Sequence, residues 1–234
     1  MAIQTIFQRY EIKYRITRAQ QERIIEAMRS RMREEVHDNK AVCNVYFDTP
    51  SHLLIRRSLE KPVYKEKVRV RSYGRVSPDG TVFLELKKKY KGVVYKRRIA
   101  LPEAQAMAYL CEGKPVADTQ IRREIDYALS YYGNLQPMMY LCYDRRAFFG
   151  VDDPHLRVTF DDNIRWRKDR LRLTEDTDGR ALLDEDTVLM EIKTATALPL
   201  WLTEVLAREK IYKTSFSKYG TAYLEEIKEE KDNG

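Results

Sequence analysis

Polar and apolar residues alternate in several short segments of the chain, and this pattern predicts β-strands. Successive side chains of a strand point to opposite faces, so each such segment has one apolar and one polar face. We expect two long strands at 63–73 and 81–90, joined by the turn sequence SPDG. With the other segments, about eight mostly antiparallel strands are predicted, at 8–16, 41–49, 63–73, 81–90, 93–101, 137–150, 156–167 and 187–194.

Other segments carry apolar residues at helical spacing. The first follows Thr17, a candidate N-cap, and places Ile24, Ile25 and Met28 on one face. Pro102 and Gly113 fit the start and the end of another helix. The predicted helices cover residues 18–32, 51–60, 102–113, 120–133, 199–209 and 217–230. The fold class is therefore α+β.

The polar faces of the predicted strands are rich in cations. Period two places Lys65, Lys67, Arg69 and Arg71 on one face of a strand, opposite Val68 and Val70. Three strands also share a Glu-aliphatic-Lys unit, at 11–13, 85–87 and 191–193. A solvated face would explain any one of these strands. Like charges directly opposite each other are destabilising, however, so the whole set favours a closed barrel with a polar interior and helices packed outside.

A basic interior is suited to binding polyanions. Lys and Arg side chains bind phosphate oxygens, and Arg does so with two parallel hydrogen bonds. The glutamates among these cations suggest a divalent metal that bridges carboxylate and phosphate. The pattern therefore predicts a site for metal and a chain of phosphates.

Composition limits the alternatives. The 234 residues are 43% hydrophobic and 34% charged, as in a globular protein, with a net charge of +7. No apolar run is long enough to cross a bilayer, and the N-terminal sequence does not read as a secretory signal, so we expect a cytoplasmic protein. The three cysteines, Cys43, Cys111 and Cys142, are expected to be buried thiols.

Seven short motifs occur in order: RYEIKY, YKEKVRVRSYG, FLELKKK, YDRRAFFG, LRVTFDDNI, LMEIKT and TSFSKYG. Together they resemble the VTC domain, the catalytic domain of vacuolar transporter chaperone polyphosphate polymerases, in the CYTH-like triphosphate tunnel metalloenzyme superfamily. The resemblance implies a single VTC-type domain over 1–234, with a core at about 7–225. It implies an eight-stranded antiparallel β-barrel tunnel that transfers the γ-phosphate of ATP to a growing polyphosphate chain.

The same motifs imply roles for individual residues. The implied catalytic residues are Lys13, Arg69, Arg71, Lys87, Arg145 and Lys218, all of which also contact phosphate. Further phosphate contacts are expected from Lys67, Arg157, Lys193 and Ser217. Glu191 is the expected ligand of Mn²⁺ or Mg²⁺, with Glu11 and Glu85 as helpers. Arg146 alternates with Arg145 and is expected to form a salt bridge on the outside.

The sequence departs from some relatives. Membrane-bound VTC polymerases carry an SPX domain and transmembrane helices, which this sequence lacks, so we expect a free-standing, bacterial or archaeal VTC domain with membrane-associated proteins as candidate partners. CYTH phosphatases prefer ExExK in the first strand, where this chain has Arg9 in place of the first Glu.

Three alternative functions remain open. The same tunnel suits a hydrolase of tripolyphosphate or nucleoside triphosphates, or a non-catalytic polyphosphate-binding protein. Nucleic-acid binding would need an exposed basic face, and we do not expect it.

Overall fold

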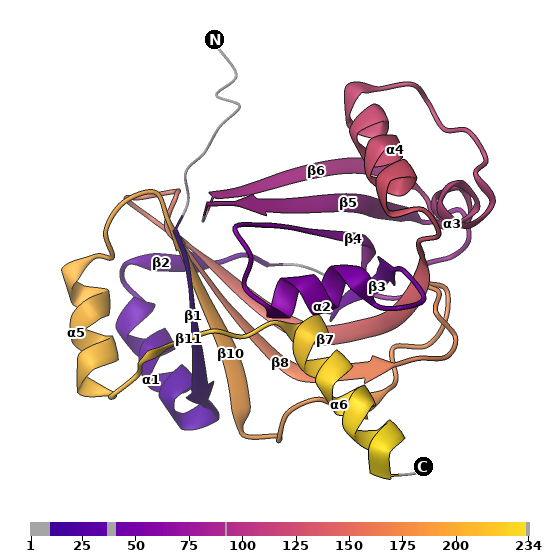
Figure 1. Cartoon of the computed structure of the whole chain (residues 1–234). Helices are drawn as coiled ribbons and strands as arrows, with labels where there is room; N and C mark the ends of the chain where they lie inside the picture. Colours follow the sequence, from indigo (N-terminus) through magenta and orange to yellow (C-terminus); the bar gives the residue numbers. More distant parts are fainter. Residues whose placement is uncertain (1–9, 37–40, 92, 233–234) are drawn as a thin grey trace. The chain divides into compact units, whose positions relative to one another are not determined.

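The computed structural model describes residues 10–36, 41–91 and 93–232, which fold into an α+β arrangement of six helices and a mostly antiparallel sheet (Figure 1). Residues 8–9 of the first predicted strand, and with them Arg9, lie outside this part of the chain. The described residues divide into two compact units. The first consists of Met1–Lys40, Tyr143–Ile164 and Leu183–Phe216, and the second of Ala41–Cys142, Arg165–Leu182 and Ser217–Gly234.

The first unit contains a sheet with the hydrogen-bonded order β11-β1-β10-β8-β7, and β2 also pairs with β7. Strands β7 and β8 contribute residues to both units. The elements are β1 (Tyr10–Thr17), α1 (Arg18–Met28), β2 (Met32–Glu34), β7 (Gln136–Gly150), β8 (Arg157–Arg167), β10 (Thr187–Thr194), α5 (Leu200–Arg208) and β11 (Lys213–Thr214). The predicted N-cap is confirmed: Thr17 and Gln20 form a reciprocal capping box that starts α1.

The second unit contains the order β7-β3-β4-β5-β6, and β9 pairs with the end of β8. Its own elements are β3 (Ala41–Asp48), α2 (Leu53–Leu59), β4 (Tyr64–Tyr73), β5 (Thr81–Tyr90), β6 (Val93–Pro102), α3 (Glu103–Glu112), α4 (Gln120–Tyr132), β9 (Arg180–Ala181) and α6 (Lys218–Asp232). Helix α3 follows Pro102 and ends at Gly113, whose φ of 68° suits a left-handed C-cap.

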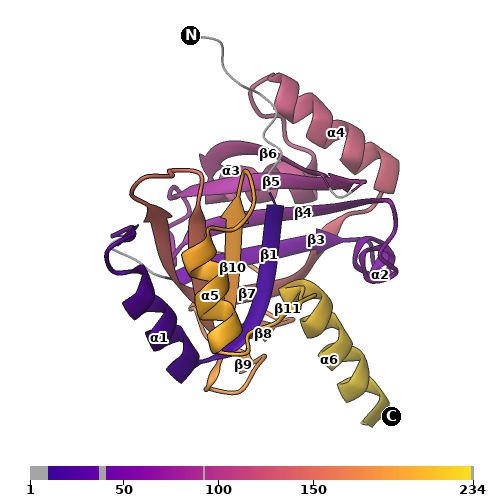
Figure 2. The same ribbon diagram turned by 90° about the vertical axis from the view of Figure 1, so that its left-hand side faces the viewer.

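Helices cover the apolar strand faces within each unit, as predicted. In the first unit, α1 and α5 bury Ile24 and Leu202 against Ile16, Val158 and Met190 of the strands (Figure 2). In the second unit, residues of α3 and α4 pack with Val68 and Leu84 in one hydrophobic cluster. Burial of these faces leaves the opposite faces of the same strands to the charged residues.

The predicted closed eight-stranded barrel is wrong, because the sheet is open. Its hydrogen-bonded order runs from β11 to β6 over the described residues, and three short strands, β2, β9 and β11, were not predicted. A closed barrel needs both edges of every strand paired, and the terminal strand β11 has only two residues, Lys213 and Thr214, to pair with. Period-two alternation places charge on one face in either architecture, so the sequence pattern did not distinguish them.

The expectation that the cysteines are buried is confirmed for two of the three. Cys43 and Cys142 are buried as predicted, but Cys111 is exposed near the end of α3. In the described part of the chain, every helix is too short or too polar to span a bilayer.

Candidate functional site

One face of β4, β5 and β6 in the second unit is strongly cationic. The strand register places Lys67 opposite Lys87, and Lys87 opposite Lys96, so three lysines form a row across three strands. The next row is Arg69, Glu85 and Arg98. The described residues of this face of the three strands carry one carboxylate and eight cations, namely Lys65, Lys67, Arg69, Arg71, Lys87, Lys89, Lys96 and Arg98. We call this face the cationic face.

Glu85 organises the centre of the cationic face. Its side chain is 1% exposed, and its Oε2 accepts from Arg69 Nε at 2.8 Å and from Nη2 at 2.6 Å. Lys96 Nζ lies 2.6 Å from Oε1. Burial raises the pKa of the Glu85 carboxyl, but the charges of Arg69, Arg71 and Lys96 outweigh burial and lower it to about 2. Glu85 therefore stays ionised and neutralises part of the surrounding positive charge.

Lys96 has a lowered pKa within the same cluster. Burial lowers the pKa of the Lys96 ammonium to about 8, although the nearby carboxylate of Glu85 opposes this change. Burial and the charges of Lys89, Lys61 and Lys87 also lower the pKa of Lys65. The cations of this face therefore repel one another, and a bound anion would relieve that repulsion.

The start of α6 adds polar groups to the cationic face. Lys67 Nζ donates to Ser217 Oγ at 2.9 Å, and the same oxygen accepts from the amide of Gly220 at 3.1 Å. Ser217 therefore caps α6. Tyr219 stacks on Tyr46 with 4.6 Å between ring centroids, which fixes this end of α6 against β3.

A second charged face lies on β1, β10 and β8 in the first unit, and it mixes both signs. The register places Glu11 opposite Lys193 and Lys13 opposite Glu191, so β1 and β10 pair opposite charges. On the other side of β10, Lys193 lies opposite Arg157 of β8. Lys13 Nζ also donates to the carbonyl oxygen of Phe216 at 2.9 Å. We call this surface the mixed face.

Arg145 and Asp161 form a buried ion pair on β7 and β8. Arg145 Nε and Nη2 donate to the two carboxylate oxygens of Asp161 at 2.6 and 2.7 Å. Burial lowers the pKa of Arg145, but interactions with Tyr143 and Asp161 outweigh burial and raise it, so the guanidinium remains charged. Arg146 forms the expected separate ion pair, with Glu34, at 2.8 and 2.7 Å.

The mixed face contains oxygen atoms that are suitable ligands for a divalent cation. Glu191 lies opposite Thr159, whose buried Oγ1 has no hydrogen-bond partner among the described residues. Hard cations prefer such oxygen ligands, and Mg²⁺ commonly binds one or two carboxylates together with substrate phosphates. Over the described residues, no cluster of three or more His, Cys, Asp or Glu side chains forms a cage for a metal. Glu191 and Glu11 are the carboxylates of the mixed face that would hold such an ion.

The structure separates the predicted site residues by unit. Glu85, Lys67, Arg69, Arg71, Lys87, Ser217 and Lys218 belong to the second unit, and Glu11, Lys13, Arg145, Arg157, Glu191 and Lys193 to the first. Two of these residues form ion pairs that the sequence did not predict. Glu85 is paired with Arg69 and Lys96, and Arg157 is paired with Glu35. The roles of all these residues in phosphate or metal binding stay predictions.

Some charged residues were missed by the sequence analysis. Lys96 and Arg98 are two residues apart on β6, so they share one face of the strand and extend the cationic face. The period-two pattern of the sequence could have revealed them. Arg98 also packs its guanidinium 4.3 Å from the centroid of the Phe83 ring. The pairing of Arg145 with Asp161 is set by contact between two strands, so no local motif signals it.

A model of the VTC domain family matches residues 8–225 of the chain. Among solved structures, a candidate adenylate cyclase from Bacillus halodurans aligns with 14% identity and a TM-score of 0.53, covering 90% of this chain and 95% of the other. A candidate adenylate cyclase from Vibrio parahaemolyticus aligns with 12% identity and a TM-score of 0.49 over 94% of this chain and 99% of the other. A Pyrococcus horikoshii protein gives 13% identity and a TM-score of 0.43, with coverage of 93% and 99%. No curated protein matches the chain.

Proposed function

Because the chain belongs to the VTC domain family, within the triphosphate tunnel metalloenzyme superfamily, we propose that it is a metal-dependent polyphosphate polymerase. It would transfer the γ-phosphate of ATP to a growing polyphosphate chain and release ADP. The observation that carries this proposal is the row of Lys67, Lys87 and Lys96 across three adjacent strands. Like charges that lie opposite each other across strands repel, and a linear chain of phosphates matches the repeated charge of this row.

The cationic face would bind and align the phosphates. Arg69 and Arg71 can each present two N–H groups to phosphate oxygens, while the lysines act as point charges. Ser217 and the amides at the start of α6 lie beside Lys67 and add neutral donors. Phosphoryl transfer depends mainly on such alignment and charge neutralisation, because the protein contributes little covalent chemistry.

The mixed face would hold the metal through Glu191, with Glu11 as the neighbouring carboxylate on the adjacent strand. A bound Mn²⁺ or Mg²⁺ would supply charge neutralisation at phosphate oxygens. Lys193 Nζ lies 3.8 Å from Glu191 Oε1, and Lys13 is the cross-strand neighbour of Glu191. Arg145, fixed by Asp161, would present its remaining N–H groups to phosphate.

The test incubates the purified chain with ATP and Mn²⁺, with and without a short polyphosphate primer. ³¹P NMR and gels would follow ADP, free phosphate and long chains. ADP with lengthening chains supports the polymerase. ADP with equimolar free phosphate and no chains would overturn it in favour of a triphosphatase, and tight polyphosphate binding without turnover would indicate a binding protein.

Matched variants connect this assay to the cationic face. Lys87→Ala removes the centre of the lysine row and should raise the KM for ATP or for primer. Lys114→Ala removes a lysine whose side chain is 67% exposed after α3, and should leave both unchanged. If the two variants had equal KM values, the cationic face would not bind ATP or primer.

A further inference from the structure

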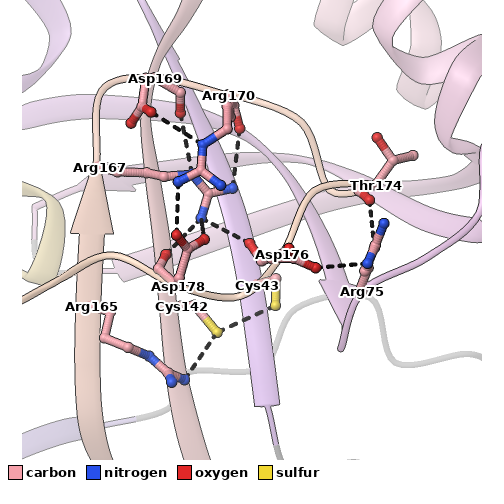
Figure 3. A network of polar contacts seen from close by, with 10 residues as sticks. All are labelled: Cys43, Arg75, Cys142, Arg165, Arg167, Asp169, Arg170, Thr174, Asp176 and Asp178. Atoms are coloured by element: carbon pink, nitrogen blue, oxygen red, sulfur yellow. Dashed lines mark hydrogen bonds and ion pairs between the residues drawn. The ribbon is translucent and has the colours of Figure 1, made fainter.

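Two cysteines from neighbouring strands of the second unit are in contact. Cys43 lies on β3 and Cys142 on β7, and the two strands are adjacent in the sheet. Both side chains are fully buried, and their Sγ atoms are 3.4 Å apart (Figure 3). Adjacent strands are separated by about 4.8 Å, which lies within the range of Cα separations that a disulfide spans.

The surroundings of the two thiols are different. Arg165 Nη2 donates to Cys142 Sγ at 3.6 Å, as Figure 3 shows. The hydrogen bond from Cys43 lowers the pKa of Cys142, and the charge of Arg165 acts in the same direction against the effect of burial. The hydrogen bond to Cys142 and burial raise the pKa of Cys43. The pKa of Cys142 is therefore lower than that of Cys43, which makes Cys142 the more nucleophilic thiol of the pair.

We propose that Cys43 and Cys142 form a reversible disulfide in response to hydrogen peroxide. The Cys142 thiolate attacks one peroxide oxygen, the O–O bond breaks, and hydroxide leaves, which gives a sulfenic acid at Cys142. Cys43 Sγ then attacks that sulfur, the S–S bond forms, and the sulfenic oxygen leaves as water with the Cys43 proton. Two thiols are oxidised, and one peroxide is reduced to two waters.

Burial predicts which oxidants act on this pair. Hydrogen peroxide is close to water in size and is uncharged, whereas glutathione disulfide is a large anion that must contact the sulfur directly. The pair should therefore react with peroxide faster than with glutathione disulfide. Cys111, which is exposed on α3, should show no such preference.

The experiment uses the full chain with Cys111→Ser, so that only the buried pair carries thiols. After peroxide treatment, the protein is denatured, alkylated and analysed by mass spectrometry. We expect the loss of both free thiols, a mass decrease of about 2 Da for the two hydrogens, and a Cys43–Cys142 cross-linked peptide that dithiothreitol removes. The cross-link should raise Tm by roughly 5–15 °C, because it restrains the unfolded chain.

Three variants in the same background test the assigned roles. Cys43→Ser should leave Cys142 to accumulate as sulfenic and sulfinic acid, and Cys142→Ser should leave Cys43 unreacted. Arg165→Met should slow disulfide formation about tenfold at neutral pH, because Cys142 loses thiolate character. Arg123→Met, which removes an exposed arginine on α4, should leave the rate unchanged.

Two results would overturn the proposal. One is that Cys43 and Cys142 remain alkylatable after a peroxide treatment that fully oxidises Cys111 in the unmodified chain. The other is separate sulfinic acids, or cross-links between chains, in place of the internal disulfide. Circular dichroism verifies that each serine variant folds. If a variant fails to fold, the Cys111→Ser chain alone still tests whether the disulfide forms.

Discussion

Replacing Glu85 with Gln should destabilise the chain in a pH-dependent way. The pKa of the Glu85 carboxyl falls from 4.5 to about 2 in the folded chain. Each unit of pKa difference between the folded and unfolded states corresponds to ~1.4 kcal/mol, so the ionised carboxylate stabilises the fold by about 3 kcal/mol at pH 7. Because the folded pKa is depressed, this stability is present above pH 4.5 and is lost as the pH falls through about 2.

Urea denaturation of the chain and of Glu85→Gln from pH 7 down to pH 3 tests this reasoning. We expect the difference in the free energy of unfolding to shrink from about 3 kcal/mol at pH 7 to about 1.4 kcal/mol at pH 3. Tripolyphosphate should stabilise the variant more than the parent, because Arg69, Arg71 and Lys96 have lost their carboxylate. A variant as stable as the parent at pH 7 would refute the account. A variant that loses its metal requirement while keeping its stability would instead place Glu85 at the metal.

Three further changes have distinct expected results. Glu191→Gln should lower metal-dependent turnover by about a hundredfold (~3 kcal/mol) with the fold intact. The control is Glu204→Gln, which changes an exposed glutamate on α5. Unchanged activity of Glu191→Gln would show that Glu191 does not bind the metal. Arg69→Ala should weaken tripolyphosphate binding by at least tenfold in calorimetry (about 1.4 kcal/mol), and an unaltered Kd would exclude this strand from the phosphate site. Arg167→Ala should free the 168–179 segment, because Arg167 donates to the carbonyl oxygens of Asp169, Arg170, Asp176 and Asp178 (Figure 3). The Arg167 guanidinium also lies 3.6 Å from the centroid of the Tyr140 ring. The measurement is trypsin cleavage at Arg170 and Arg172, and unchanged cleavage would contradict this expectation.

The sequence predicted the elements well where local signals are strong. The strand at 187–194 and the Thr17 cap agree with the structure because alternation and capping are local properties. The charged faces also followed from period two alone. The two-residue strands β9 and β11 carry no such period, and the open sheet depends on which strand edges pair, so neither was accessible from the sequence pattern.

The partners of the charged side chains were less predictable. Glu85 was assigned to a metal because it lies in a Glu-aliphatic-Lys unit, yet the unit on β5 faces Arg69 and Lys96 of the two neighbouring strands. The same unit on β10 faces Lys13 and Thr159. One motif thus has two electrostatic environments, and the environment is set by strand register, which the motif does not encode.

An anion bound to the row of Lys67, Lys87 and Lys96 would make folding of this chain responsive to its surroundings. A ligand that binds only the folded chain stabilises it by about 2.7 kcal/mol at a hundred times its Kd. Differences of this size change how often a protein opens and is captured by cellular proteases. If phosphate polymers are that ligand, the cell would retain more of this protein when the polymers are abundant and degrade it faster when they are depleted. The abundance of the protein would then follow its own substrate, with no dedicated sensor.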